Sequence, residues 1–490
     1  MAFAYDDSRC YEYGWRTHWG MKINWTPEHL KPKDLEPLIH TYDIIGSEAV
    51  QRLNEIAPPP YTQKTSGGDN GDVHKNIKEK NIEGAIKPDG EKKPRRDLYT
   101  LMQEHASTDE KIGKLWDEIN TIPEWVDWAQ IERGQKIFFR YGGPALTTLT
   151  FLSLLGGMGS GRTVETLDRT GGFGAGVVRR RLLETTQHTL NVHKDLASMQ
   201  PGGDGFVNSV RVRLLHASVR ARIMGLAAQR ASYYDTAAYG APISDLDCIG
   251  TINTFSATVI WMGLPRQGIY LREGEVADYL ALWRYVAYLM GTPHDWMRTP
   301  GSARRMMESL LVSEIKPTQA SANLANNIIT GLQGQAPTYA SRGFMCAQTW
   351  WLNGSELSEA LCIERPSLWY RALVLGQVMF FMATAYVNRA VRYLDEKNIE
   401  LTKNVLFRIL LHDKSKGGLG YTTKFNMKYI PDFDNMTTAR GSEEEEEKGR
   451  ASGIARPGTE RAALVSLLWF VGLVGAGAWY AGKAAMGMMA

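Results

Sequence analysis

The fold is decided by the stretch Phe206-Val-Asn-Ser-Val-Arg-Val-Arg-Leu-Leu-His-Ala-Ser-Val-Arg-Ala-Arg-Ile-Met-Gly225. Its large apolar residues recur every three or four positions, which is the period of an α-helix with one buried face. Val212, Val219 and Ile223 lie four residues before, three after and seven after His216. The pattern therefore predicts a long helix whose buried face carries one histidine.

The histidine on this face has two interpretations. It is either a hydrogen-bonded core residue or the single axial ligand of a haem inserted between helices, which needs one imidazole in an apolar slot. Arg220 and the other arginines beside the apolar face have the charge to pair with haem propionates. No HxxxH or ExxH spacing in this region indicates a non-haem iron site with several protein ligands.

A second polar pattern precedes this helix. Arg181, Glu184, Thr185 and His188 are spaced i, i+3, i+4 and i+7, so on a helix they share one face. The simplest interpretation is a solvated face with an Arg–Glu ion pair. The alternative is a set of polar groups that face a bound cofactor.

Composition narrows the class of protein. The chain has 490 residues, of which 43% are hydrophobic and 22% charged, with a net charge of +3. These values are typical of a globular protein and give no argument for a nucleic-acid partner. The four cysteines, Cys10, Cys248, Cys346 and Cys362, are far apart, which favours reduced thiols in a cytosol-facing domain.

The patterning divides the chain into five regions. We expect an N-terminal arm packed on the core (1–61), a mobile polar insertion (62–97), a large helical catalytic domain (98–436), a polar and acidic linker (437–461) and a membrane anchor (462–482). A capping box at Ser244 and Asp247 predicts the start of a helix. The apolar segments 142–159 and 373–387 are predicted to be buried core helices.

The anchor is predicted from length and charge. Residues 462–482 contain no charged side chain, and at about 1.5 Å per residue they span roughly 31 Å, the thickness of a hydrocarbon core. Arg450, Arg456 and Arg461 precede the segment and Lys483 alone follows it, which favours a cytosolic main domain. No signal peptide is recognised at the N-terminus. Small residues four apart in the span, as at Gly472 and Ala476, permit pairing into a homodimer.

Several motifs, in order from about Asp97 to Arg392, resemble one family. They are Pro123-Glu-Trp-Val-Asp-Trp, Arg133-Gly-Gln-Lys-Ile-Phe-Phe, Arg181-Leu-Leu-Glu-Thr185, Val212-Arg-Leu-Leu-His-Ala-Ser-Val-Arg220, Gly240-Ala-Pro-Ile-Ser-Asp-Leu-Asp, Gly250-Thr-Ile-Asn-Thr-Phe-Ser256 and Leu352-Asn-Gly-Ser-Glu-Leu-Ser-Glu-Ala-Leu361. Together they resemble the catalytic domain shared by bacterial rubber oxygenases (latex-clearing proteins) and the fungal ER-bound oxygenase of mycophenolic acid biosynthesis.

The resemblance implies an all-α fold with a globin-like core and one haem b held by a proximal histidine, which here is His216. The family's distal arginine and threonine match Arg181 and Thr185, whereas the place of its distal lysine is taken by Glu184. Glu165 lies near an acidic residue that is proposed to act as a base in the family.

The implied activity is dioxygen activation and oxidative cleavage or oxygenation of a lipophilic, isoprenoid or lipid-like substrate, on an endoplasmic reticulum membrane with the catalytic domain in the cytosol. A glutamate at the lysine position repels an anionic oxygen species unless it is protonated or paired with Arg181. Two alternatives therefore stay open. One is a non-catalytic haem-binding module, and the other is a tail-anchored interaction module without a cofactor.

Overall fold

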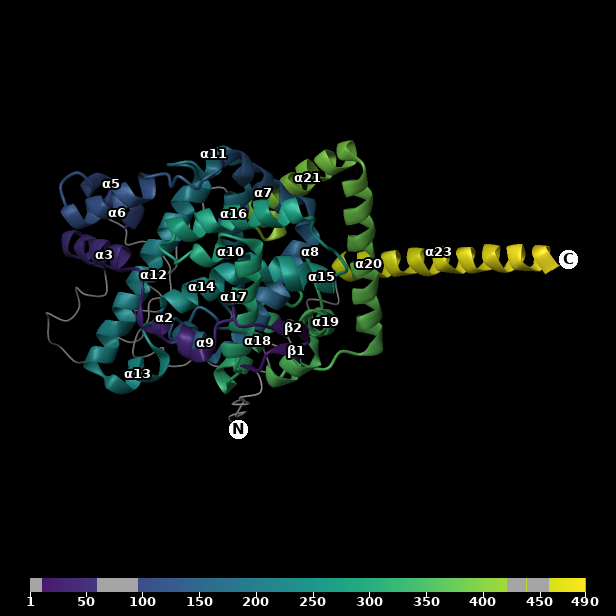
Figure 1. Cartoon of the computed structure of the whole chain (residues 1–490), viewed down its shortest axis with the longest axis horizontal. Coiled ribbons are helices and arrows are strands. Elements are labelled where there is room, and N and C mark those ends of the chain that lie inside the picture. Colours follow the sequence, from purple (N-terminus) through teal and green to yellow (C-terminus); the bar gives the residue numbers. More distant parts are fainter. Residues whose placement is uncertain (1–10, 60–95, 421–437, 439–457, 490) are drawn as a thin grey trace.

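The computed structural model describes residues 11–59, 96–420, 438 and 458–489. Helices dominate these residues, so the all-α fold is confirmed, although a short β-hairpin precedes them (Figure 1). Most of the predicted insertion 62–97 and of the linker 437–461 lies outside the described residues.

The elements follow one another closely along the chain. The first are β1 (Gly14–His18), β2 (Met21–Trp25), α1 (Pro32–Leu35), α2 (Pro37–His40), α3 (Ile44–Ile56), α5 (Leu98–His105), α6 (Glu110–Asn120), α7 (Trp128–Arg140), α8 (Gly142–Thr147), η3 (Thr148–Leu155), η4 (Gly156–Gly159), α9 (Gly161–Arg169), α10 (Val178–His193), α11 (Leu196–Met199) and α12 (Asp204–Gln229). The next are η5 (Ala231–Tyr233), α13 (Thr236–Tyr239), α14 (Asp245–Phe255), η6 (Val259–Gly263), α15 (Leu264–Arg266), α16 (Glu273–Leu289), η7 (Asp295–Met297), α17 (Pro300–Ser313), α18 (Gln319–Leu332) and α19 (Arg342–Ala360). The last are α20 (Leu368–Ala390), α21 (Arg392–Leu406), η8 (Phe407–His412), η9 (Lys414–Lys416) and α23 (Gly458–Met489).

The predicted long helix is α12, which follows α10 after the short helix α11 and packs against α10. His188 on α10 is linked to Ser209 on α12, with Nε2 3.0 Å from Oγ. The capping box is also confirmed, because the Ser244 side chain accepts a hydrogen bond from the Asp247 amide at the start of α14. Local sequence signals therefore predicted α12 and the start of α14 correctly.

Two large hydrophobic clusters form the core. One is built around α3, α6, α7, α12 and α16, and the other contains the β-hairpin residues Trp19 and Trp25 together with η3, α18 and α19. Segment 142–159 folds into α8, η3 and η4, and most of its side chains are buried, as predicted.

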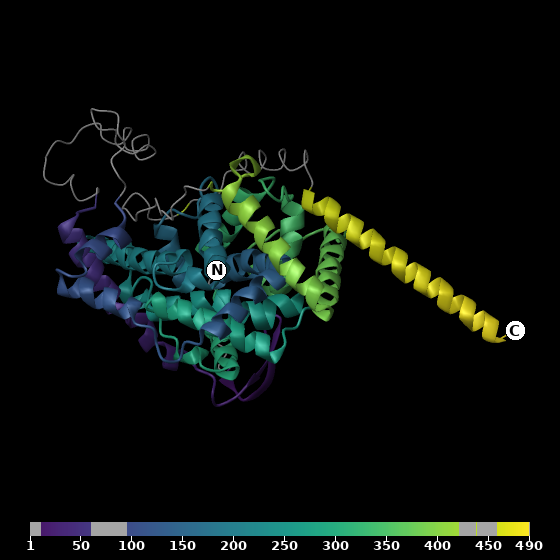
Figure 2. The same ribbon diagram turned by 90° about the horizontal axis from the view of Figure 1, so that it is seen from above.

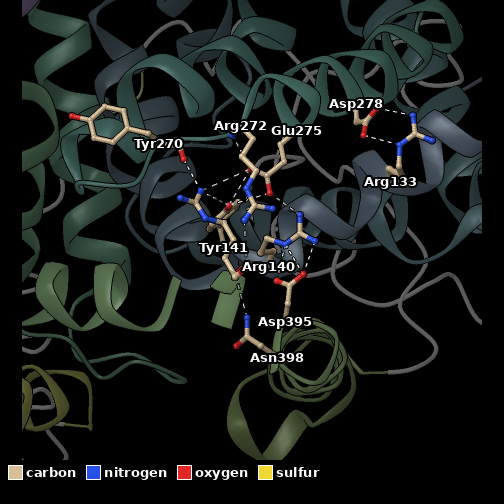
Figure 3. A network of polar contacts seen from close by, with 10 residues as sticks. Arg133, Arg140, Tyr141, Tyr270, Arg272, Glu275, Asp278, Asp395 and Asn398 are labelled. Atoms are coloured by element: carbon tan, nitrogen blue, oxygen red, sulfur yellow. Dashed lines mark hydrogen bonds and ion pairs between the residues drawn. The ribbon is translucent and has the colours of Figure 1, made fainter. Parts of the chain in front are cut away.

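A buried ionic network fastens α21 to the body (Figure 3). Arg140 at the end of α7 donates to Glu275 of α16 over 2.8 Å and to Asp395 of α21 over 2.6 Å. The Tyr141 hydroxyl lies 3.2 Å from both oxygens of Glu275 and accepts a hydrogen bond from Arg389 of α20. Burial and the neighbouring Glu275 raise the pKa of Tyr141 to about 12, so its hydroxyl stays protonated as a donor.

Two long apolar helices occupy one end of the molecule. α20 lies along the surface of the body, while α23 crosses it and points away from the body (Figures 1 and 2). By length and composition α20 is a helix that could cross a membrane, yet only 28% of its most apolar 18-residue window is buried. The prediction that segment 373–387 is a buried core helix is therefore wrong for its outer face, because apolar composition does not reveal which neighbours a helix finds.

Candidate functional site

A cavity of about 400 Å³ lies inside the helical body, between the two hydrophobic clusters. Its wall takes residues from α9, α10, α12, α14, α17 and η3. Apolar side chains such as Leu182, Val212, Phe255, Met307 and Leu357 form most of this wall. Its size and lining suit an apolar ligand held away from water.

His216 on α12 faces this cavity. Val212 and Val219, one turn to either side, line the same wall, so the helix presents the histidine in an apolar setting. Its Nδ1 atom is enclosed and has no hydrogen-bond partner. Burial, together with the charges of Arg220 and Arg181, lowers the pKa of His216 to about 4. The imidazole is therefore neutral at physiological pH, the form that binds a metal.

Helix α10 carries all four residues of the predicted polar stripe, and three of them line the cavity. Arg181, Thr185 and His188 line the cavity. Arg181 donates from Nη1 to the Thr170 hydroxyl over 3.0 Å, and its guanidinium stacks 4.4 Å from the ring centre of Phe173. These contacts hold a cation in place at the cavity wall.

Glu184 lies apart from the other three. Its side chain is 6% exposed, and Glu184 is not among the cavity-lining residues. Arg180 donates from Nε to Glu184 Oε1 over 3.1 Å. On a helix, residue 184 is rotated to one side of residues 181, 185 and 188. The other three side chains therefore face the cavity, while Glu184 is buried beside it.

Glu165 and Arg220 also lie outside the cavity wall. Glu165 Oε2 accepts a hydrogen bond from Arg169 over 2.8 Å on α9. Arg220 is 3% exposed and donates to the Ser47 hydroxyl over 2.7 Å and to the Ile243 carbonyl over 2.8 Å. The guanidinium expected to meet haem propionates is thus engaged by protein oxygens, and its positive charge reaches His216 only through space.

A polar cluster on the cavity wall was not recognised from the sequence. Arg162 on α9 lies 2.9 Å from Asp247 on α14 and 3.0 Å from Glu314 after α17. The Thr163 hydroxyl donates to Asp247 Oδ1 over 2.8 Å. Burial alone would lower the pKa of Arg162, but Asp247 and Glu314 together raise it. The capping box signalled only the local role of Asp247, because its other partners, Thr163 and Arg162, lie 84 and 85 residues away in sequence.

The residues present fit a group that needs one axial nitrogen ligand. His216 offers a neutral imidazole at an apolar wall, and the enclosed Nδ1 atom leaves the other ring nitrogen as the available donor. His188 faces the same cavity, but its Nε2 is already bonded to Ser209. Burial lowers the pKa of His188 to about 4, so it too is neutral. Among the described residues no group of three or more His, Cys, Asp and Glu side chains is arranged to hold a metal ion.

Comparison with known proteins identifies the family and the fold of the chain. The family model described as "ER-bound oxygenase mpaB/B'/Rubber oxygenase, catalytic domain" matches residues 140–385, about half of the chain. The chain is 20% identical over 268 residues to the rubber oxygenase of Streptomyces sp. (strain K30), and the match spans 54% of this chain and 63% of that relative. It also shares the fold of latex-clearing protein LCP in the closed state, with a TM-score of 0.51 and 15% identity over 85% of this chain and 98% of that one. The resemblance expected from the motifs is confirmed, and the chain belongs to the family of ER-bound oxygenases and rubber oxygenases.

Proposed function

We propose that the protein is a haem-b-dependent oxygenase that uses dioxygen to cleave or oxygenate a lipophilic substrate. One observation carries the proposal: the neutral imidazole of His216 and the fixed cation of Arg181 line the same apolar cavity. A haem bound there would supply the activation of dioxygen. The proposal is supported by the family to which the chain belongs, whose model describes oxygenases.

In this proposal four residues of the site region have defined roles. His216 would hold the haem iron through its unprotonated ring nitrogen. Arg181 provides a positive charge that is already oriented by Thr170 and Phe173, so it stabilises negative charge without rearranging. Thr185 places a hydroxyl on the same wall, one helical turn after Arg181. Glu184 does not enter the cavity, and its pairing with Arg180 keeps its charge from opposing Arg181.

The substrate class follows from the apolar wall and from the names of the relatives. A rubber oxygenase acts on a polyisoprene, and we propose an isoprenoid or lipid-like molecule with a carbon–carbon double bond for this protein. Oxidative cleavage would insert both atoms of one dioxygen molecule and convert the two alkene carbons into two carbonyl groups. That reaction balances without a separate reductant.

We further propose that α23 anchors the protein in the endoplasmic reticulum membrane with the body in the cytosol. The helix includes the whole uncharged segment 462–482 and projects from the body (Figure 1). Arg461 precedes that segment and Lys483 follows it. An anchor of this kind keeps the cavity next to the phase in which lipophilic substrates dissolve.

The absorption spectrum tests the proposal. The purified protein, expressed with sufficient haem, should show a Soret band, and His216→Ala should abolish it. His105→Ala is the matched control, because His105 on α5 does not line the cavity. A colourless wild-type protein would overturn the proposal, while a Soret band without dioxygen uptake on unsaturated isoprenoids would favour a non-catalytic haem-binding module.

A further inference from the structure

The outer face of α20 is apolar and uncovered. Leu368 is 81% exposed, Trp369 53%, Phe380 51% and Val387 58%. No charged residue occurs in the helix between Arg371 and Arg389. A helix on the surface of a water-soluble body normally turns a polar face outward, and a contiguous apolar face marks a contact with a partner or a membrane.

The inner face of α20 is fixed to the body. Leu373, Val374 and Val378 are buried in the core. The Tyr386 hydroxyl donates to the Gly268 carbonyl over 3.1 Å, and Gln348 donates to Gln377 over 2.8 Å. A helix held in this way along one side lies on the body and does not pass through a bilayer, although its length would permit that.

The helix α23 leaves the body from this same face. A Cβ atom at Gly376 of α20 would lie 2.5 Å from the Ala463 carbonyl and 2.7 Å from Leu467 Cβ, so the two helices cross in close contact. The exposed apolar surface continues from α20 onto Leu468 and Trp469 of α23. Figures 1 and 2 both show α23 pointing away from the body beyond this crossing.

We infer that α20 lies in the surface of the same membrane that α23 spans, with its outer face in contact with lipid. The inference rests on the proposed anchoring, because the crossing at Gly376 places α20 where the uncharged segment 462–482 begins. Trp369 near the start of α20 and Tyr393 just after its end are exposed, and such rings favour the boundary between headgroups and hydrocarbon. The protein then has one spanning helix and one helix that lies in the interface.

This arrangement brings the lipid close to the cavity. Phe381 of α20 packs against Gly143 of α8, and α8 continues into η3. Leu146 of α8 and Leu149 of η3 belong to the cavity wall. The lipid-facing helix is therefore separated from the cavity by one helical segment.

Photo-crosslinking of the full-length chain in liposomes tests the inference. The photoreactive residue p-benzoylphenylalanine replaces one exposed residue at a time: Phe380 on α20, Val471 on α23 or Ile44 on α3. Ile44 is 54% exposed and begins α3, a helix at the opposite end of the body from α20 (Figure 1), so it is the matched control. Mass spectrometry then identifies whether each position forms an adduct with lipid or with another protein chain.

The expected result is a lipid adduct at 380 and at 471, each several-fold more abundant than at 44. A lipid adduct at 471 without one at 380 would overturn the inference and leave the anchor standing. A chain–chain adduct at 380 would show that a second copy covers α20 and would also overturn it. Absence of a lipid adduct at 471 would refute the anchor and the inference together.

Discussion

Arg180 holds Glu184 through a hydrogen bond of 3.1 Å from Nε to Oε1, one residue before the cavity-lining Arg181. The glutamate is buried, whereas the side chain of its partner is 44% exposed. Glu184 is thus turned away from the cavity and tied to Arg180, one turn earlier on the same helix. The sequence pattern placed Arg181 and Glu184 on one face of the helix, but in the structure only Arg181 lines the cavity.

Changes at Glu184 should therefore affect stability more than chemistry. Glu184→Gln keeps the shape but removes the charge, and it should lower the free energy of unfolding by about 1–2 kcal/mol, since a part-buried hydrogen bond loses its charge assistance. Glu184→Lys places a cation opposite Arg180 and should cost about 3–5 kcal/mol. Urea unfolding measures both. Loss of dioxygen uptake in a fully folded Glu184→Gln protein would contradict this assignment.

Arg181 should affect chemistry more than stability. Arg181→Leu removes the oriented cation from the cavity wall and should lower the rate of dioxygen uptake by roughly 100-fold or more, the usual effect of losing one preorganised charge-stabilising group. Arg181→Lys keeps the charge without the planar fork and should be intermediate. Steady-state dioxygen uptake measures the rate, and the Soret band checks that haem remains bound.

The control for Arg181 is Arg133→Leu. Arg133 pairs with Asp278 at the surface, and neither residue lines the cavity. The rate of this variant should match that of the unsubstituted protein. If Arg133→Leu also lowers the rate of dioxygen uptake, the effect of Arg181→Leu is not specific to the cavity, and the role assigned to Arg181 is refuted.

Buried histidines should make the protein sensitive to acid. Burial lowers the pKa of His188 to about 4 and that of His193 to about 3, below the ordinary value of 6.5. Between these values and pH 6.5 the unfolded chain binds protons that the folded chain does not, so stability falls as the pH falls through this window. Each histidine should cost about 1.4 kcal/mol per pH unit there.

Urea unfolding at pH 7, 6 and 5 checks this pH dependence. His193→Phe keeps a ring between Phe138 and Tyr279 but cannot bind a proton. Its stability should change less steeply with pH than that of the unsubstituted protein. Parallel pH dependence in the two proteins would show that His193 is not a source of the acid sensitivity.

The sequence predicted the helical class and the positions of α12 and α14, because helix periodicity and capping are local properties. It also singled out His216, whose neighbours Val212 and Val219 form the cavity wall. It did not predict the partners of Asp247 or the position of Arg220, since these depend on residues far away in the chain. The exposed face of α20 was not predicted for the same reason. Its composition is that of a core helix, and its exposure depends on which elements of the fold pack against it.

The ionic network in Figure 3 should be a major source of stability for the attachment of α21. Glu275 is 8% exposed and accepts hydrogen bonds from Arg140 and Tyr141. Glu275→Ala removes one of the two carboxylates that pair with Arg140, leaving Asp395 as the other, and it takes the acceptor from the Tyr141 hydroxyl. It should lower the free energy of unfolding by about 1–3 kcal/mol. Glu396→Ala is the control, because its pair with Arg392 is exposed on both sides and should be worth less than about 1 kcal/mol. Equal losses in the two variants would contradict the importance assigned to burial.

The crossing of α20 and α23 depends on a residue without a side chain at position 376. Gly376→Val would place its Cβ 2.5 Å from the Ala463 carbonyl, closer than real contacts allow, and should force α23 away from α20. Valine forms helices at least as well as glycine, so any effect comes from the contact and not from the helix itself. Arg461 is exposed at the start of α23, and trypsin should cleave after it faster in this variant.

Gly472→Val is the matched control for the crossing, because no atom lies within 4 Å of a Cβ atom at that position of α23. Its rate of tryptic cleavage after Arg461 should equal that of the unsubstituted protein. If Gly376→Val is also cleaved at the unsubstituted rate, α23 does not depend on this contact for its position. If both variants are cleaved faster, the cause is a change within the helices. Faster cleavage of Gly376→Val alone identifies the crossing as the joint that sets where α23 leaves the body.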